Sequence, residues 1–527
     1  MRRYKGLDNR KKVIKSFGLY LVGISLVACS HFSLIYLQSS LNVENGLGAT
    51  CLTIVYSTAL VSGLIICPIF LKFFSVRNGM ILYDITALIY CAANFYPEYY
   101  TLVPASILVG FGKSLFWICS GTFVVYYAKL FQTLGKPGTE NNTSTINGLV
   151  LSGIYAAQVV GNLVSFLVFR EEDQSTTTGS SNKTTWETQS ATVTQTIYNF
   201  KVSDVCAAKD CQNPEITERI LSRYVPPQQT KVYIVMSVYL GITLIGLILH
   251  VFVVPSDHNE VTLEKKINSY DNKAFSEIKK TDFTNKNTVR DNMKTDREKF
   301  REETDVSPRS KIKDKCYEVL DELKLTFKHY VNRQQLLLMW LQIHGGMNRS
   351  FLSGEITRAY VSCIFGVAEV GVCMAIYGAS TFLTALVNGK ISAIYGRKII
   401  TIAGFLFNLG VYCFCLLWVP DEYSESWIAF VLLFFYGIVD GLWQPLTTGS
   451  VAVFFPENSK RAFACWQLCT SISFVIQFSW STSLCVNAKI YVLLATLCIG
   501  VTTQIIAEYR RARELKGNIY NVQVTAL

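Results

Sequence analysis

The chain has 527 residues and a formal net charge of +11, and 50% of its residues are hydrophobic whereas only 17% are charged. Its mean hydropathy of +0.29 is too high for a soluble protein of this length and excludes an ordinary soluble enzyme. The lipid bilayer is therefore the expected solvent, and membrane lipids are the first expected partners. The positive charge is typical of loops that face an anionic inner leaflet, and no nucleic-acid partner is predicted.

Apolar windows of about 20 residues, the length that crosses a bilayer, recur along the chain and number about twelve. In chain order they cover 14–37, 50–72, 79–96, 101–127, 146–169, 231–254, 333–356, 368–393, 399–418, 426–452, 461–485 and 488–508. The seventh window is the weakest, because His344, Arg349 and Glu355 interrupt it. The predicted fold is all-α and polytopic.

The basic N-terminal segment MRRYKGLDNRKK precedes the first window, and no small-residue cleavage site follows that window. The first helix is therefore expected to remain as a signal anchor. Lys and Arg concentrate in the segments that face the cytoplasm if the N-terminus lies there. The predicted units are a cytoplasmic N-terminus 1–13, a six-helix bundle 14–254, a cytoplasmic charged linker 255–332, a second six-helix bundle 333–508 and a cytoplasmic tail 509–527.

Two long segments interrupt the apolar windows. The outer loop 170–230 is rich in Ser and Thr and contains Asn182, the one glycosylation sequon that this topology exposes,. Cys206 and Cys211 share that loop, in an oxidising compartment, so a disulfide is predicted there. The linker 255–332 carries mixed charges and is expected to be a solvated spacer, although CYEVLDELKLTFKHY near its end predicts a short amphipathic helix on the inner membrane surface.

A weak internal repeat relates the two predicted bundles. The fourth window contains GFGKSLFWICSG and the tenth contains YGIVDGLWQPLTTG, and duplicated halves are the pattern of major-facilitator transporters. The segment GKISAIYGRK resembles the inner-loop signature of that superfamily but has Ala393 where an acidic residue is expected. The residues that match this signature are Gly389, Gly396, Arg397 and Lys398.

Ionisable side chains at membrane depth cost at least about 2.5 kcal/mol unless they find partners or water, so each is a candidate functional residue. In this chain they are His31, Lys113, His344, Arg349, Glu355 and Asp440, and they fall in windows one, four, seven and ten. Those four helices line the central cavity of a major-facilitator fold, and only Asp84 in window three departs from the series. The sequence therefore predicts a shared polar interior.

Lys113 and Asp440 occupy approximately equivalent positions of the two halves and carry opposite charges. They could pair across the cavity, either as a gate or proton-coupling element or as a static ion pair that orients the halves. His31 and His344 could be proton relays, but bonded core histidines are the more common case. Gly110, Gly112 and Gly437 are most simply close-packing positions between helices.

Nothing in the sequence supports catalysis. A phosphate-binding loop, a GxSxG elbow and a zinc motif are all missing from it,. The protein is therefore expected to be neither an enzyme nor dependent on a cofactor or metal ion.

The whole chain resembles the uncoordinated-93 family of major-facilitator-like proteins, and in particular its short-tailed members. The matching segments are LQSSLNVENGLG, GFGKSLFWICSG with Trp117, FLSGEITRAYVSCIFGVAEVG, and DGLWQPLTTGSVAVFFPENSKRAFACWQ with Trp443 and Gln444. The resemblance implies a regulatory partner of two-pore-domain potassium channels in the plasma membrane. The alternatives are a secondary transporter of a small solute or ion, and a trafficking chaperone for membrane receptors in endosomal or endoplasmic reticulum membranes.

Overall fold

The computed structural model describes residues 2–42, 47–134, 142–170, 206–211, 229–253, 308–365, 368–421, 424–480 and 484–525. Within these residues the secondary structure is helical and contains no β-strand. Asn182 and most of the charged linker, residues 254–307, lie outside them. The predicted glycosylation and the predicted solvated spacer therefore remain predictions.

Each predicted span coincides with helical structure. The first part of the chain forms α1 (Arg2–Leu41), α2 (Leu47–Val61) with its continuation through η2 (Ser62–Ile66) into α3 (Cys67–Phe73), α4 (Val76–Ala93), α5 (Tyr99–Leu134), α6 (Asn142–Arg170) and α11 (Gln229–Val253). The second part forms α15 (Arg333–Phe351) with its continuation through η4 (Leu352–Ser362) into α16 (Cys363–Phe365), α17 (Ala368–Tyr395), α18 (Arg397–Leu417), α19 (Trp427–Phe454), α20 (Ser459–Ser479) and α21 (Val486–Thr525).

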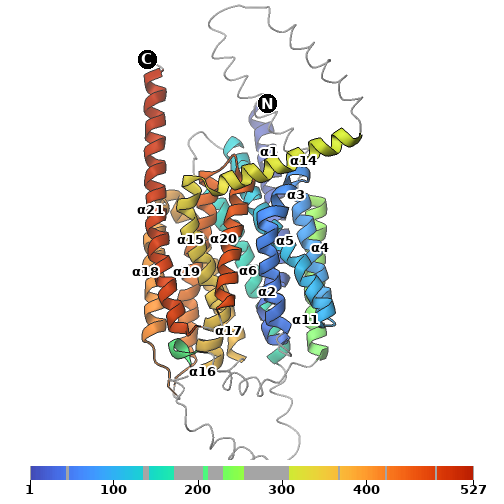
Figure 1. The fold of residues 1–527 in the computed structure, drawn as a ribbon, viewed down its shortest axis with the longest axis vertical. Helices are drawn as coiled ribbons and strands as arrows, with labels where there is room; N and C mark the ends of the chain where they lie inside the picture. Colours follow the sequence, from blue (N-terminus) through green and yellow to red (C-terminus); the bar gives the residue numbers. More distant parts are fainter. Residues whose placement is uncertain are drawn as a thin grey trace, which may run out of the picture.

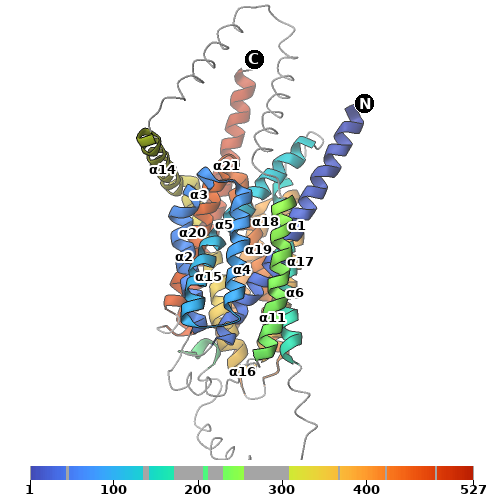
Figure 2. The ribbon, with the colours of Figure 1, turned by 90° about the vertical axis from the view of Figure 1, so that its right-hand side faces the viewer.

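Ten of the described helices are long and apolar enough to cross a membrane. α4 and α15 run alongside them and complete the bundle, as Figures 1 and 2 show from two directions. The chain is thus an integral membrane protein. Its two ends lie at the same end of the bundle (Figure 1), as an even number of crossings requires.

Helices from the first and second parts of the chain pack against each other along the bundle. α6 lies against α17, and both α2 and α5 contact α20. The rings of Trp117 on α5 and Trp466 on α20 meet with their centroids 5.5 Å apart, and Tyr56 on α2 stacks on Phe474 at 4.2 Å. The interface between the halves is therefore packed with aromatic side chains.

Three segments differ from the sequence expectation in extent. Most of the predicted tail 509–527 continues α21 as far as Thr525, and the predicted N-terminal segment 1–13 belongs to α1 from Arg2. The residues of EYRRARELKG are mostly strong helix formers with no proline, so nothing ends the helix at the membrane boundary. The predicted amphipathic helix is α14 (Pro308–Tyr330), which crosses one end of the bundle in Figure 1 and begins at a proline, a residue favoured in the first helical turn.

Candidate functional site

The Asp440 carboxylate lies at the contact between the two halves. It is fully buried in α19, and its Oδ2 atom accepts hydrogen bonds from Tyr155 Oη on α6 and Tyr377 Oη on α17, both at 2.9 Å. Burying a carboxylate is costly unless hydrogen bonds and an opposite charge compensate it. The two tyrosines supply the hydrogen bonds, and Tyr155 does so from the opposite half of the molecule.

The opposite charge comes from Arg349 on α15. Its Nη1 atom lies 3.6 Å from Asp440 Oδ1 and also donates to Gln444 Oε1, one turn after Asp440 on α19. Arg349 and Asp440 thus form a mostly buried ion pair. Removing one partner of such a pair is strongly destabilising, although the intact pair adds little stability relative to an apolar core.

Lys113 does not pair with Asp440, so the predicted ion pair across the cavity is wrong. Arg349 is the cation that lies nearest the carboxylate, 3.6 Å from Oδ1, and both tyrosine hydroxyl groups donate to Oδ2. The Lys113 ammonium group instead lies 3.8 Å from the centroid of the Tyr56 ring, an arrangement that stabilises a cation. Lys113 is only 5% exposed, and no carboxylate among the described residues pairs with it.

His31 lies on the Lys113 side of the site. Its ring is buried between aromatic rings, with centroid distances of 5.5 Å to Phe32 and 5.4 Å to Tyr83. Neither ring nitrogen has a hydrogen-bond partner. The Lys113 charge acts on His31, and the Arg349 charge acts on Lys113. Lys113, Arg349 and Asp440 together therefore provide two cationic groups and one anionic group, with an unbonded imidazole beside them. We call these four residues the central cluster.

The interior next to Arg349 has room for an additional group. Gly345 lies one turn before Arg349 on α15 and is buried, yet a Cβ atom added to it would meet no atom within 4 Å outside its own helix. In a close-packed interior such a position marks empty space. The central cluster thus has an excess of positive charge, and there is open space beside Gly345, one turn from Arg349.

Two of the predicted cavity residues lie elsewhere. His344 contacts Asn408 Oδ1 through Nε2 at 2.9 Å and Thr496 Oγ1 through Nδ1 at 3.1 Å, which makes it a bonded core histidine of the second half. Glu355 accepts from Lys489 Nζ and from Arg358 Nη2, each at 2.6 Å. Glu355 therefore belongs to a separate ionic group near the end of α15.

The halves are also joined near the beginning of α6. Asn147 donates from Nδ2 to the Pro445 carbonyl oxygen at 3.0 Å and to Thr448 Oγ1 at 2.9 Å. Beside it, Gly148 and Gly389 let the backbones of α6 and α17 touch, because a Cβ on Gly148 would lie 2.7 Å from the Gly389 Cα atom. These contacts close the interface at the end of the bundle that carries the termini.

At the end of the bundle opposite the termini, two disulfides join a loop segment to the second half. Cys206 bonds to Cys363 and Cys211 bonds to Cys485, so the predicted bond between Cys206 and Cys211 is wrong. The short segment 206–211, which includes η3 (Ala207–Lys209), thereby attaches to the second half at both of its ends. The Asp210 carboxylate pairs with Arg358. The backbone carbonyl oxygen of Asp210 accepts a hydrogen bond from the Val486 amide at 2.9 Å. Part of the loop that follows α6 is therefore covalently fixed to the other half.

The remaining glycine, tryptophan and signature residues that the sequence analysis named make the following contacts. Gly110, Gly112 and Gly437 are close-contact positions, since an added Cβ would lie within 2.5 Å of an atom on a neighbouring helix at each. Trp443 Nε1 donates to Asn408 Oδ1 at 2.9 Å. Gly396 has a φ of +82° immediately before α18, Arg397 forms a bidentate bond with Glu508 at 2.6 and 3.0 Å, and Lys398 is exposed.

Sequence reasoning missed Tyr155, Tyr377 and Lys489. The sequence does not show that a tyrosine within an apolar helix has a buried partner. Lys489 lies in the first turn of α21, near the end of a span, where a lysine usually reaches water. In the described part of the chain, no group of three or more His, Cys, Asp or Glu side chains could hold a metal ion.

Comparisons with known proteins show which family the chain belongs to. A family model described as "Ion channel regulatory protein UNC-93" matches residues 39–505. The chain belongs to the UNC-93 family. Family relatives include "Protein unc-93 homolog A" of Mus musculus, which is 28% identical over 95% of this chain and 94% of its own length. The same protein of Xenopus laevis is 26% identical over 94% of both chains.

The name of a less similar relative refers to the regulation of a channel. "Putative potassium channel regulatory protein unc-93" of Caenorhabditis elegans is 22% identical over 93% of this chain, which spans 60% of that longer protein. Among solved structures, the proton:xylose symporter XylE matches with a TM-score of 0.55 and 13% identity over 94% of this chain and 95% of its own. FucP in the outward conformation matches with a TM-score of 0.54 and 11% identity, over 95% and 99%. These similarities establish the major-facilitator fold for the family member described here.

Proposed function

We propose that the protein is a non-enzymatic regulatory subunit of a potassium channel, with a two-pore-domain channel as its partner. The observation that carries this proposal is the family match over residues 39–505, whose description is channel regulation. The name of the Caenorhabditis elegans relative specifies potassium channels. Regulation would act through association of helices within the bilayer, which shifts the open probability or the surface number of the channel.

The geometry favours a binding role over a transport cycle. A transporter of this fold exposes its centre alternately by rocking one half against the other. Here Asp440 bonds to a tyrosine of the first half, Asn147 bonds to two groups of the second, and the disulfides fix segment 206–211 to the second half. The hydrogen bonds of Asp440 and Asn147 add to the cost of separating the halves, as suits a stable surface for a partner.

We propose that both termini and α14 face the cytoplasm and that the protein resides in the plasma membrane. The disulfides lie at the end of the bundle opposite the termini, and disulfides form and persist in oxidising compartments. The basic N-terminal segment lies at the other end, as expected for the cytoplasmic side. This orientation also predicts that Asn182, in the same loop as Cys206 and Cys211, is glycosylated.

Affinity purification of the tagged protein from native membranes in mild detergent tests the assignment. We expect a potassium channel subunit to copurify in near-stoichiometric amount, as quantified by mass spectrometry. Recovery of a Toll-like or other membrane receptor in its place would support the trafficking chaperone. A monomer with no copurifying membrane protein would contradict both binding roles.

The central cluster favours one second candidate, secondary transport of a small anion. Lys113 is buried beside the Arg349–Asp440 pair without a carboxylate of its own, and a small anion would balance its charge. In proteoliposomes, Lys113→Met is then expected to abolish uptake of radiolabelled chloride or short carboxylic acids. The matched control is Lys324→Met, an exposed lysine on α14, which should leave uptake intact. Equal counts in protein-containing and empty liposomes for every anion would exclude this candidate.

A further inference from the structure

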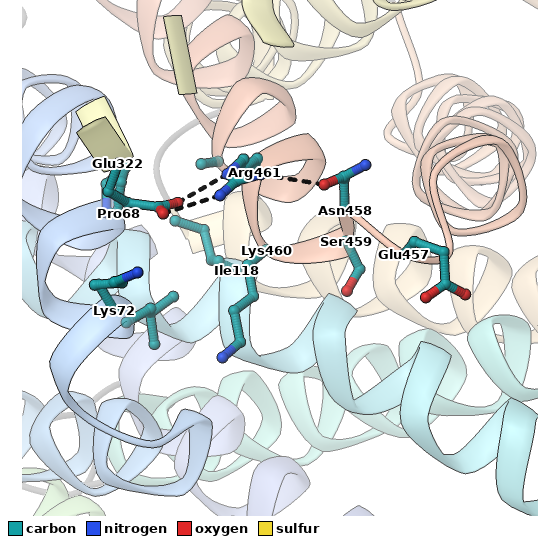
Figure 3. Close-up of a pocket in the computed structure, with 11 residues that line it drawn as sticks. Pro68, Lys72, Ile118, Glu322, Glu457, Asn458, Ser459, Lys460 and Arg461 are labelled. Carbon is teal, nitrogen blue, oxygen red and sulfur yellow. Dashed lines mark hydrogen bonds and ion pairs between the residues drawn. The ribbon is translucent and has the colours of Figure 1, made fainter. Parts of the chain in front are cut away.

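A cavity of about 370 Å³ lies where α14 meets the bundle, between α3, α5 and α20 (Figure 3). Leu71, Ile118 and Ala464 supply an apolar part of its wall. Basic residues line the remainder, from the last turn of α3 and the first turns of α20. The cavity therefore joins an apolar surface to a basic one.

The acidic side chains of this cavity are already neutralised. Arg461 binds Glu322 of α14 in bidentate fashion, with Nε–Oε1 and Nη2–Oε2 distances of 2.8 and 2.9 Å, as the dashed lines in Figure 3 show. This contact holds the pKa of Glu322 below its ordinary value, so the pair stays ionised near neutral pH. Glu457 bonds to Lys129 Nζ at 3.0 Å. Neither carboxylate is left to balance other cations.

Two lysines of the same cavity have no such partner. Lys72 and Lys460 are both exposed, and neither forms an ion pair or hydrogen bond with another described residue. Both carry charges that act on Glu322, which places them within electrostatic range of the same point. Figure 3 shows them on adjacent sides of the cavity. The lining itself carries three positive and two negative side chains. Because Lys129, outside the lining, pairs with Glu457, about two positive charges remain for an incoming ligand at neutral pH.

The position of the cavity relates it to the membrane surface. Lys72 ends the span Thr50–Phe73, and Lys460 begins the span Ser459–Ser479, so both lysines lie at the level where apolar helix gives way to water. α14 crosses the bundle at this end (Figure 1). Its exposed apolar residues Tyr317, Leu320 and Phe327 lie on one face of the helix, as in helices that lie in a membrane interface.

We propose that this cavity binds the phosphorylated headgroup of an anionic phospholipid. Basic cavities between transmembrane helices are suited to such headgroups, and the apolar wall can contact the glycerol and upper acyl carbons of the lipid. A phosphomonoester carries a charge of about −1.5 to −2 at neutral pH, which matches Lys72 and Lys460 together. The site is independent of the channel-regulatory role and of the central cluster.

Native mass spectrometry of the full chain tests this proposal, using mixed micelles of phosphatidylcholine and phosphatidylinositol 4-phosphate. We expect the wild-type protein to retain the phosphorylated lipid in preference to phosphatidylcholine. In the double variant Lys72→Ala and Lys460→Ala, retention should fall by roughly tenfold or more, because each lysine near a headgroup contributes about a factor of five. The matched control is Lys390→Ala with Lys398→Ala, two exposed lysines on α17 and α18, and it should retain lipid as the wild type does.

Each alternative has a distinct outcome. Equal retention of both lipids by the wild type, or an equal loss in the control variant, would contradict a site at this cavity. Displacement of the lipid by soluble inositol 1,4-bisphosphate at equimolar concentration would show that the acyl contacts are unimportant and overturn the lipid assignment. Melting temperatures of all three proteins, measured by tryptophan fluorescence, ensure that a loss of retention is not a loss of folding.

Discussion

Replacement of Asp440 by asparagine is expected to lower the free energy of unfolding by about 3–5 kcal/mol, because it leaves the mostly buried Arg349 guanidinium without a counter-ion. Tyr155 and Tyr377 can still donate to the asparagine oxygen, so the lost charge accounts for most of the effect. The measurement is the melting temperature in detergent, followed by tryptophan fluorescence. The amount of monodisperse protein should decline with it.

A second substitution separates the ion pair from general damage to the core. Adding Arg349→Met to Asp440→Asn removes both charges, and the double variant should recover more than half of the lost stability. Glu457→Gln removes one partner of the exposed Lys129–Glu457 pair and should change stability by less than about 1 kcal/mol. A double variant no more stable than Asp440→Asn would falsify the ion pair as the source of the effect.

Removal of the disulfides should have the next largest effect. Cys206→Ser with Cys363→Ser, or Cys211→Ser with Cys485→Ser, is expected to cost about 2–5 kcal/mol per bond. The bonded residues are separated by 157 and 274 positions, so each bond closes a long loop and restricts the unfolded chain strongly. The readout is the melting temperature of the paired variants against the wild type.

Cys498 provides the control for this experiment, because it is a free, exposed thiol. Cys498→Ser should leave the melting temperature unchanged. Mass spectrometry of peptides from the unreduced protein should then identify the Cys206–Cys363 and Cys211–Cys485 linkages. A peptide that contains a Cys206–Cys211 bond would instead show that the loop closes on itself, without attachment to the second half.

The helical framework was predictable from the sequence because its signal is local. Each apolar window of about 20 residues coincides with a helix, even where charges interrupt it, as in α15. The repeat and the family segments indicated the major-facilitator fold, which the family match and the solved structures confirm. The ends of the helices were less predictable, since α21 runs into a charged segment that is itself a good helix former.

The partners within the site were not predictable, because they depend on contacts between distant segments. The sequence placed Lys113, Arg349 and Asp440 in the same interior but offered no means to decide which cation reaches the carboxylate. In the structure Arg349 reaches the carboxylate, and tyrosines on α6 and α17 donate hydrogen bonds to it. Cysteine connectivity has the same limitation, because spacing alone does not specify a pairing, and proximity in the loop favoured the wrong partner for Cys206.

The most direct test of the channel-regulatory role is a current recording. A two-pore-domain potassium channel is expressed in cultured cells with the wild-type protein, with the Asp440→Asn and Arg349→Met double variant, or alone, and whole-cell potassium current is compared with surface channel number. We predict that the wild-type protein changes the current several-fold and that the double variant, where it folds, retains this effect. An unchanged current and surface number for every two-pore-domain channel tested would contradict the proposed function.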